Sequence, residues 1–103
     1  MTIYLSRSSN PRKKFMVKIK NGKTIHFGSK KPYYEDYTIH KDPERKQRYI
    51  ARHSQSNEDW TKSGIDTAGF WSRWLLWGEP TLGQSIKKIE NKFGVKIVRR
   101  LTM

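Results

Sequence analysis

Apolar and polar side chains alternate along two short runs near the N-terminus, residues 14–19 and 24–27. Alternation with a period of two predicts β-strands. The Asn21-Gly22 pair between the two runs predicts that they form a hairpin. A further short strand is expected at residues 2–5.

The apolar faces of the two strands determine the register of this hairpin. A two-residue loop would pair Val17 with His26 and would place the two apolar sets on opposite faces of the sheet. A three-residue loop that ends in a left-handed Gly22 pairs Val17 with Ile25 and keeps the apolar side chains on one face. We therefore expect the second register.

Helical signals begin after residue 41. Asp42 and Pro43 suit the N-cap and the first position of a helix, which is expected to run to about residue 53. The short segment 37–40, directly before this helix, is expected to be a strand.

Two more helices are expected toward the C-terminus. Asp66 is the expected cap of the first, which ends at Gly78. The second of these helices begins at Thr81, which matches the pattern of a capping box. Its apolar residues recur at i, i+4, i+7 and i+11 and form one stripe, and Gly94 ends the helix. Residues 95–99 predict a final strand.

These elements together predict an α+β fold in one small domain that spans residues 1–103. An N-terminal β-hairpin or small antiparallel sheet packs with about three helices and a C-terminal strand. Residues 6–14 are rich in Ser, Asn, Pro and basic side chains, so residues 1–14 are expected to be a flexible basic segment.

Aromatic residues are expected to supply much of the core, because only 34% of the chain is hydrophobic and each ring buries a large area. Phe70, Trp74 and Trp77 recur at i, i+4 and i+7 and are expected to face inward. Trp71 lies at the edge of this stripe and is expected to be exposed. The candidates for base stacking or for an interface are Trp71, Tyr33 and Tyr34. For the two tyrosines, packing of a loop on the sheet is an equal alternative.

The net charge is the strongest indication of the kind of partner. The chain has 22 Lys and Arg against 9 Asp and Glu, a formal net charge of +13 and a pI near 10.2. Residues 1–53 carry a net +10 and residues 54–103 a net +3. Such a charge attracts polyanions, which means nucleic acid, an acidic membrane surface or an acidic protein.

Contacts to phosphate need basic side chains spread over a surface rather than one motif. Arg45, Arg48 and Arg52 share one face of the expected helix, whereas Tyr49 and Ile50 are expected to point elsewhere, toward the core. Lys14 and Lys18 are expected on the outer face of the hairpin. The candidate nucleic-acid-binding residues are Arg12, Lys13, Lys14, Lys18, Lys20, Lys23, Lys30, Lys31, Arg45, Lys46, Arg48 and Arg52.

Other functional classes find little support. The absence of cysteine excludes disulfides, thiol catalysis and Cys-type zinc sites. His53, Asn57, Glu58 and Asp59 do not match a known metal-ligand spacing, and no Gly-rich phosphate loop or nucleophile–base pair stands out. We therefore expect no enzyme, no catalytic residues, no metal and no cofactor. No apolar run approaches the ~20 residues that span a bilayer, and no signal peptide is recognisable, so we expect a protein that acts inside a cell or inside a particle assembled there.

The middle of the chain resembles a known group of proteins. The stretches RYIARH (48–53), NEDW (57–60) and GIDTAGFWSRWLLW (64–77), with residues 37–43 and 80–82, are similar to a family of small basic proteins of nucleocytoplasmic large DNA viruses. The resemblance covers about residues 33–97. It implies a place in the virion or in the virus factory of the host-cell cytoplasm, and it brings no catalytic residues with it.

Three functions are compared. The first is a non-enzymatic, sequence-independent DNA-binding protein that contacts the duplex backbone and helps to package or organise a viral genome. The second is a minor capsid or cement protein of the virion interior, with capsid proteins as partners. The third and least favoured is a metal-dependent nuclease at His53, Glu58 and Asp59. DNA and RNA, and monomer and dimer, all fit this sequence.

Overall fold

The computed structural model describes residues 1–19, 22–29 and 35–100. Its four strands form one mixed sheet in the order β3-β2-β1-β4. They are β1 (Thr2–Arg7), β2 (Lys13–Lys18), β3 (Thr24–Ser29) and β4 (Lys96–Arg100). β1 runs antiparallel to β2 and parallel to β4. With its helices the domain has the α+β fold that the sequence predicts.

The hairpin of β2 and β3 has the predicted register. Val17 pairs with Ile25, and Phe15 pairs with Phe27. Gly22 has a φ of 87°, and its N–H donates to the Ile19 carbonyl at 2.8 Å. The left-handed conformation that glycine adopts without steric cost therefore sits where the three-residue loop requires it.

The N-terminal segment is an integral part of the sheet. Residues 1–14, expected to be a flexible basic segment, contain β1, which lies between β2 and β4. Ile3 and Leu5 of β1 are fully buried. The turn into β2 is held by the Ser8 N–H, which donates to the Lys14 carbonyl at 3.2 Å. Two-sided pairing and burial of alternate side chains order this segment in spite of its polar end.

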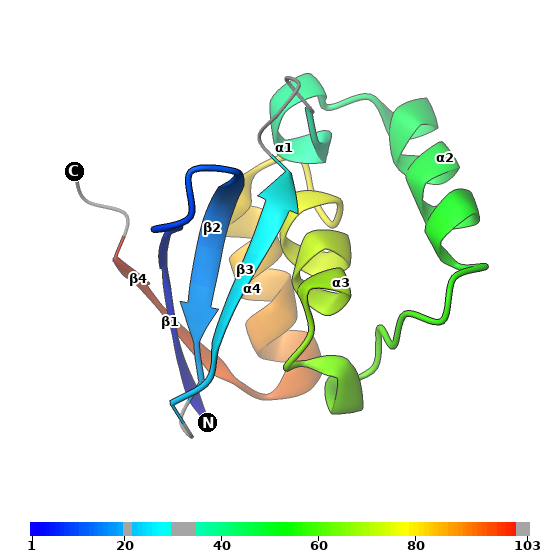
Figure 1. The fold of residues 1–103 in the computed structure, drawn as a ribbon. Coiled ribbons are helices and arrows are strands. Elements are labelled where there is room, and N and C mark those ends of the chain that lie inside the picture. The colour runs from blue at the N-terminus through cyan, green and yellow to red at the C-terminus, as the bar shows by residue number, and fades with distance from the viewer. Residues whose placement is uncertain (20–21, 30–34, 101–103) are drawn as a thin grey trace.

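Helices cover one face of the sheet (Figure 1). In chain order the helical elements are α1 (Tyr37–His40), α2 (Pro43–His53), the 3₁₀ turn η1 (Lys62–Gly64), α3 (Ala68–Trp71), the π-helical turn η2 (Ser72–Leu76) and α4 (Leu82–Phe93). The core lies between the sheet and α3, η2 and α4. Figure 1 shows α2 at one edge of the molecule, set apart from the sheet. None of the helices in the described parts of the chain is long and apolar enough to cross a membrane.

The prediction of a strand at residues 37–40 is wrong, because this segment forms α1. The Asp36 carboxylate accepts a hydrogen bond from the Thr38 N–H at 2.9 Å and caps the helix. Lys41 closes it in a left-handed conformation with a φ of 55°. A capping carboxylate satisfies N–H groups that the first helical turn leaves free, and this local chemistry outweighs the β-propensity of Tyr37 and Ile39.

Most of the predicted helix ends are confirmed. Asp42 caps α2 with Pro43 in its first turn. Thr81 caps α4, and Gly94 ends it with a φ of 66°. The exception is α3, whose cap is Thr67 rather than Asp66. The Asp66 carboxylate instead lies 3.4 Å from Lys23 Nζ.

Trp71 is fully buried, which contradicts the prediction that it is exposed. Its indole N–H donates to the Ile65 carbonyl at 2.7 Å, whereas Trp74 and Trp77 are only partly buried. The reason is η2, where the hydrogen bonds join residues five apart, as from the Trp77 N–H to the Ser72 carbonyl at 3.1 Å. The inward positions accordingly repeat with a spacing of five, at Phe70, Trp71, Leu75 and Leu76.

Candidate nucleic-acid interface

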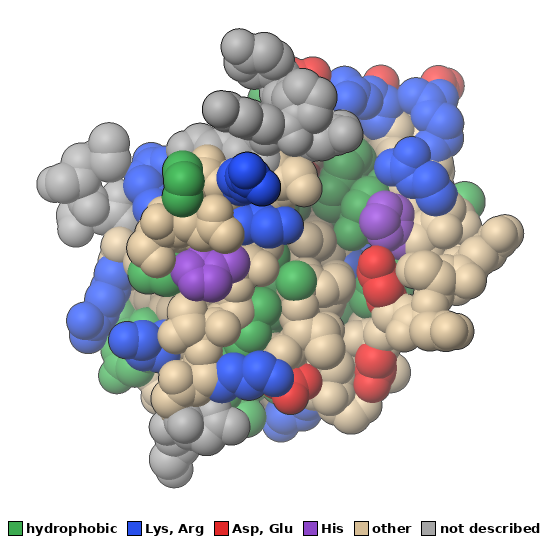
Figure 2. Space-filling model, viewed as in Figure 1, with side chains coloured by type: hydrophobic (Ala, Val, Ile, Leu, Met, Phe, Trp, Pro, Cys, Tyr) green, Lys and Arg blue, Asp and Glu red, His purple; other side chains and the backbone are tan. Residues whose placement is uncertain are grey.

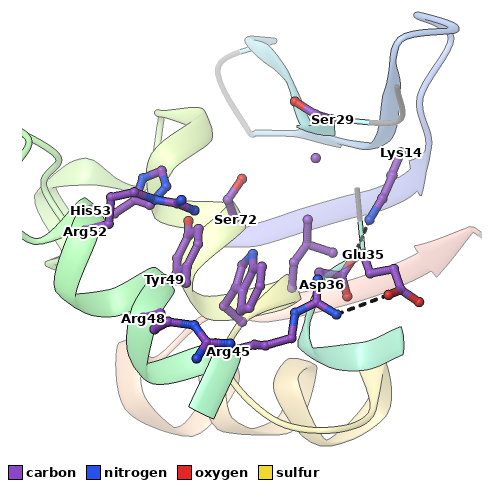
Figure 3. A pocket seen from close by; sticks show the side chains of 13 residues that line it. Lys14, Ser29, Glu35, Asp36, Arg45, Arg48, Tyr49, Arg52, His53 and Ser72 are labelled. Atoms are coloured by element: carbon purple, nitrogen blue, oxygen red, sulfur yellow. Dashed lines mark hydrogen bonds and ion pairs between the residues drawn. The ribbon is translucent and has the colours of Figure 1, made fainter. Parts of the chain in front are cut away.

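A cleft of about 590 Å³ separates α2 from the rest of the domain. One wall is the face of α2, and the other is formed by β2, the end of β3 and η2 (Figure 3). Figure 2 shows basic side chains over α2 on one side of this hollow and over the sheet on the other. The lining residues are Lys14, Gly28, Ser29, Glu35, Asp36, Arg45, Arg48, Tyr49, Arg52, His53, Ser72, Leu76 and Trp77.

The predicted arginine row of α2 forms one wall of the cleft. Arg45, Arg48 and Arg52 all line it. Arg45 pairs with Glu35 at 3.2 Å, and the pair is solvent-exposed. Among the residues that the structure describes, Arg48 and Arg52 make no ion pair, and both are exposed. Two guanidinium groups at the cleft are therefore not engaged in an ion pair within the described part of the chain.

Tyr49 is buried, as expected, but it shares the cleft-facing side of α2 with the arginines instead of pointing away from them. The spacing explains this, because Tyr49 stands four residues after Arg45 and three before Arg52. Its ring stacks between Trp77, with centroids 4.4 Å apart and planes at 5°, and His53, at 4.2 Å and 24°. Burial raises the pKa of the Tyr49 hydroxyl well above its ordinary value. The stack fixes α2 to the body of the domain.

Lys14 is part of the opposite wall rather than an outward-facing cation of the hairpin. Its Nζ lies 2.6 Å from Asp36 Oδ2, and the two side chains are 15% and 4% exposed. Gly28 makes room for this wall, because a Cβ at this position would lie 2.8 Å from Leu76 Cδ1 and 3.2 Å from the Lys14 Cβ. The backbone of Gly28 is left-handed, with a φ of 82°. The charge of Lys14 is therefore neutralised by a buried carboxylate and is not available to a ligand.

Lys46, another candidate phosphate contact, has partners within the fold. Its ammonium group donates to the Gly78 carbonyl at 2.7 Å and lies 5.0 Å from the centroid of the Tyr37 ring. Burial lowers the pKa of this amine, and the nearby charge of Arg73 lowers it further. Lys46 thus ties α2 to the turn that follows η2 and does not line the cleft.

The remaining candidate cations are divided between the two ends of the hairpin. Arg12 and Lys13 lie in or beside the turn between β1 and β2. Lys13 is opposite Ser29 in the register of β2 and β3, and Ser29 lines the cleft. Lys18 and Lys23 lie at the opposite end, where Lys23 pairs with Asp66 at 3.4 Å. The predicted residues Lys20, Lys30, Lys31, Tyr33 and Tyr34 lie outside the described residues.

Of the residues considered for a metal site, His53 and Glu58 contact each other, whereas Asp59 has other partners. His53 Nδ1 lies 3.0 Å from Glu58 Oε2, and Glu58 Oε1 accepts from the Trp60 indole at 2.9 Å. Asp59 accepts hydrogen bonds from Ser63 and Thr61, which lower its pKa. In the described ranges, no three His, Cys, Asp or Glu side chains are grouped so that they could hold a metal ion.

Sequence reasoning missed the residues that complete the cleft. Ser29 comes from the end of β3 and Ser72 from η2, and Glu35 and Asp36 precede α1. None of these residues shares a motif or a helical spacing with the arginines of α2. Only the tertiary packing brings them together, so no local signal in the sequence could have revealed them.

Comparison with known proteins identifies one similarity. The sequence model of a protein family of unknown function (DUF5754) matches residues 3–53, which extend from β1 to the end of α2. No curated protein and no solved structure matches the chain. The matched segment contains the arginine row and the Lys14–Asp36 pair but lacks η2, so it includes only part of the cleft. The family description names no activity, and the resemblance to viral proteins stays a prediction.

Proposed function

We propose that this protein binds the phosphate backbone of nucleic acid, duplex DNA in the first place, without reading its sequence. In keeping with the viral resemblance, we place this activity in genome packaging or organisation, in the virion or the virus factory. The proposal depends on the exposed guanidinium groups of Arg48 and Arg52 on one side of α2, which make no ion pair with the described residues. Guanidinium groups bind phosphate through paired, charge-assisted hydrogen bonds.

The position of other cations supports the same partner. Arg12 and Lys13 lie at the end of the sheet where Ser29 lines the cleft. A polyanion that lies along this end of the molecule could contact the α2 arginines and the β1–β2 turn together. Contacts of this kind position a protein on DNA but carry no sequence information.

The test is binding of labelled duplex DNA across a salt series. Each phosphate neutralised contributes about 0.9 to the slope of log affinity against log salt on duplex DNA. Replacing Arg48 and Arg52 together by glutamine should reduce the magnitude of the slope by about two and weaken binding at low salt. Lys87→Gln with Lys96→Gln removes the same charge from exposed positions that do not line the cleft, and it should have the smaller effect.

Two outcomes would overturn the proposal. Binding that is weak and insensitive to salt would redirect the search to an acidic protein partner, as expected for a minor capsid or cement protein. An equal loss in both double variants would mean that net charge, and not the α2 arginines, attracts the DNA.

A further inference from the structure

The shape of the cleft suits a ligand that enters it rather than one that lies across it. Basic and hydroxyl groups face the hollow from both walls, with Arg48 and Arg52 on α2 and Ser29 and Ser72 opposite (Figure 3). Its volume of about 590 Å³ falls in the range of pockets that enclose small molecules. A volume of this size corresponds to one small ligand, such as a single nucleotide, rather than to a length of duplex.

The charge of the cleft fits one form of phosphate. Four basic and two acidic side chains line it, which leaves a net charge of +2 with His53 neutral. Because Lys14 and Arg45 are paired with Asp36 and Glu35, the surplus is that of Arg48 and Arg52. A phosphate monoester carries about −1.5 to −2 at neutral pH and has three acceptor oxygens. One backbone phosphodiester has a single negative charge and two free oxygens, so two neighbouring phosphates would be needed to match the surplus that one monoester can match alone.

The rest of the lining suits the organic part of a nucleotide. Leu76 at the end of η2 and Trp77 after it give the cleft apolar surface beside its polar groups, and the Tyr49 ring stacks on Trp77. Pockets for small ligands combine such apolar walls with a few polar groups that fix the orientation.

We propose that the cleft binds a phosphomonoester on a nucleotide, and specifically the phosphorylated end of a nucleic-acid strand. This inference rests on the proposed function, since it names the part of the nucleic acid that the α2 arginines receive. It goes beyond that function because a backbone binder has no reason to prefer an end.

The experiment compares single-stranded 15-mers that differ only at the terminus. A strand with a 5′-phosphate and one with a 5′-hydroxyl each carry a 3′ fluorophore, and a mirror pair tests a 3′-phosphate. Fluorescence anisotropy at moderate salt should show at least about tenfold tighter binding of a phosphorylated end, as expected for charge-assisted contacts with two guanidinium groups. Arg48→Gln with Arg52→Gln should abolish this preference, and Lys87→Gln with Lys96→Gln should keep it.

Competition identifies the source of the phosphomonoester. A thymidine monophosphate that displaces the phosphorylated strand only at far higher concentration supports the strand end. Displacement at equal concentration would overturn the strand end and assign the cleft to free nucleotides. A phosphoserine peptide that competes better than either would overturn the nucleotide altogether.

The two proposals fail in different ways. If phosphorylated and hydroxyl ends bind equally while duplex DNA still shows the steep salt dependence that Arg48 and Arg52 control, the strand-end site is refuted and backbone binding stands. If neither duplex nor single strands bind, both proposals are refuted. The near-ultraviolet circular dichroism of the stacked Tyr49 and Trp77 rings would establish that each variant keeps its fold.

Discussion

The buried ion pair between Lys14 and Asp36 offers a sharp test of how the cleft wall is built. Asp36 is 3% exposed, and its carboxylate holds Lys14 Nζ at 2.6 Å while it accepts from the Thr38 N–H at 2.9 Å. Asp36→Asn keeps an oxygen that can cap α1. The substitution therefore removes the ion pair and leaves the cap in place.

The expected loss follows from the burial of the two partners. Removing one member of a buried pair costs about 3–5 kcal/mol, because the other charge stays uncompensated. Lys14 remains 15% exposed, so water partly solvates its ammonium group, and we expect a loss of about 2–3 kcal/mol for Asp36→Asn. In Lys14→Met with Asp36→Asn no buried charge is left, and most of the lost stability should return.

Urea denaturation followed by tryptophan fluorescence measures these changes. With a slope of about 1–3 kcal/mol per molar, which is usual for a small domain, the midpoint of Asp36→Asn should fall by about 0.7–3 M. A double-mutant cycle then gives the coupling energy of the pair. A loss below about 0.5 kcal/mol for Asp36→Asn, or additive effects of the two substitutions, would refute the assignment of this ion pair as a structural element.

Three further predictions concern other parts of the fold. Trp71→Ala should cost about 3–5 kcal/mol, as other large-to-small core substitutions do, and a loss below 1 kcal/mol in urea denaturation would contradict its full burial. Gly28→Ala should cost at least about 1–3 kcal/mol, because a side chain at its left-handed φ is strained and meets Leu76; an unchanged thermal midpoint would argue against it. Burial, and next the charge of Arg45, lower the pKa of His40 below its ordinary 6.5. The unfolded chain therefore binds more protons than the folded one near and below this value, so stability should fall as the pH drops through about 6.5. This loss should be smaller in His40→Gln, and equal pH dependence in both proteins would refute the role of His40.

The features that the sequence could predict are those determined by neighbouring residues. Asp42 and Thr81 cap their helices through hydrogen bonds to N–H groups two or three residues ahead. The register of the hairpin follows from the alternation of side chains and from Gly22. In each case the physical cause lies within a few positions of the chain.

The features that could not be predicted from the sequence depend on residues far apart in the chain. β1 pairs with β4, which is more than ninety positions away, and this pairing turns the supposed flexible N-terminal segment into an inner strand. The π-helical turn depends on how the segment packs against the sheet and α4. The cleft joins Arg48 and Arg52 to Ser29 and Ser72, and no spacing relates these residues.

Net charge does not reveal the individual contacts of the basic side chains. The sequence indicates which side chains are basic but not which of them neutralise a carboxylate or bind a carbonyl within the fold. Lys14 and Lys46, both predicted phosphate contacts, have such partners. The arginine row was predicted correctly as a group because three positions on one helix face need no tertiary information.

The π-helical turn also bears on how the chain length can vary in this fold. A π-turn contains one residue more than an α-helical turn. Loss of one residue from 72–76 would let that segment relax to an α-helix and leave the chain beyond it in nearly the same orientation. The same loss within α4 would rotate its apolar stripe by about 100° and turn lysines toward the sheet. Among natural variants of this chain, single-residue deletions should therefore be tolerated at η2 and excluded from α4.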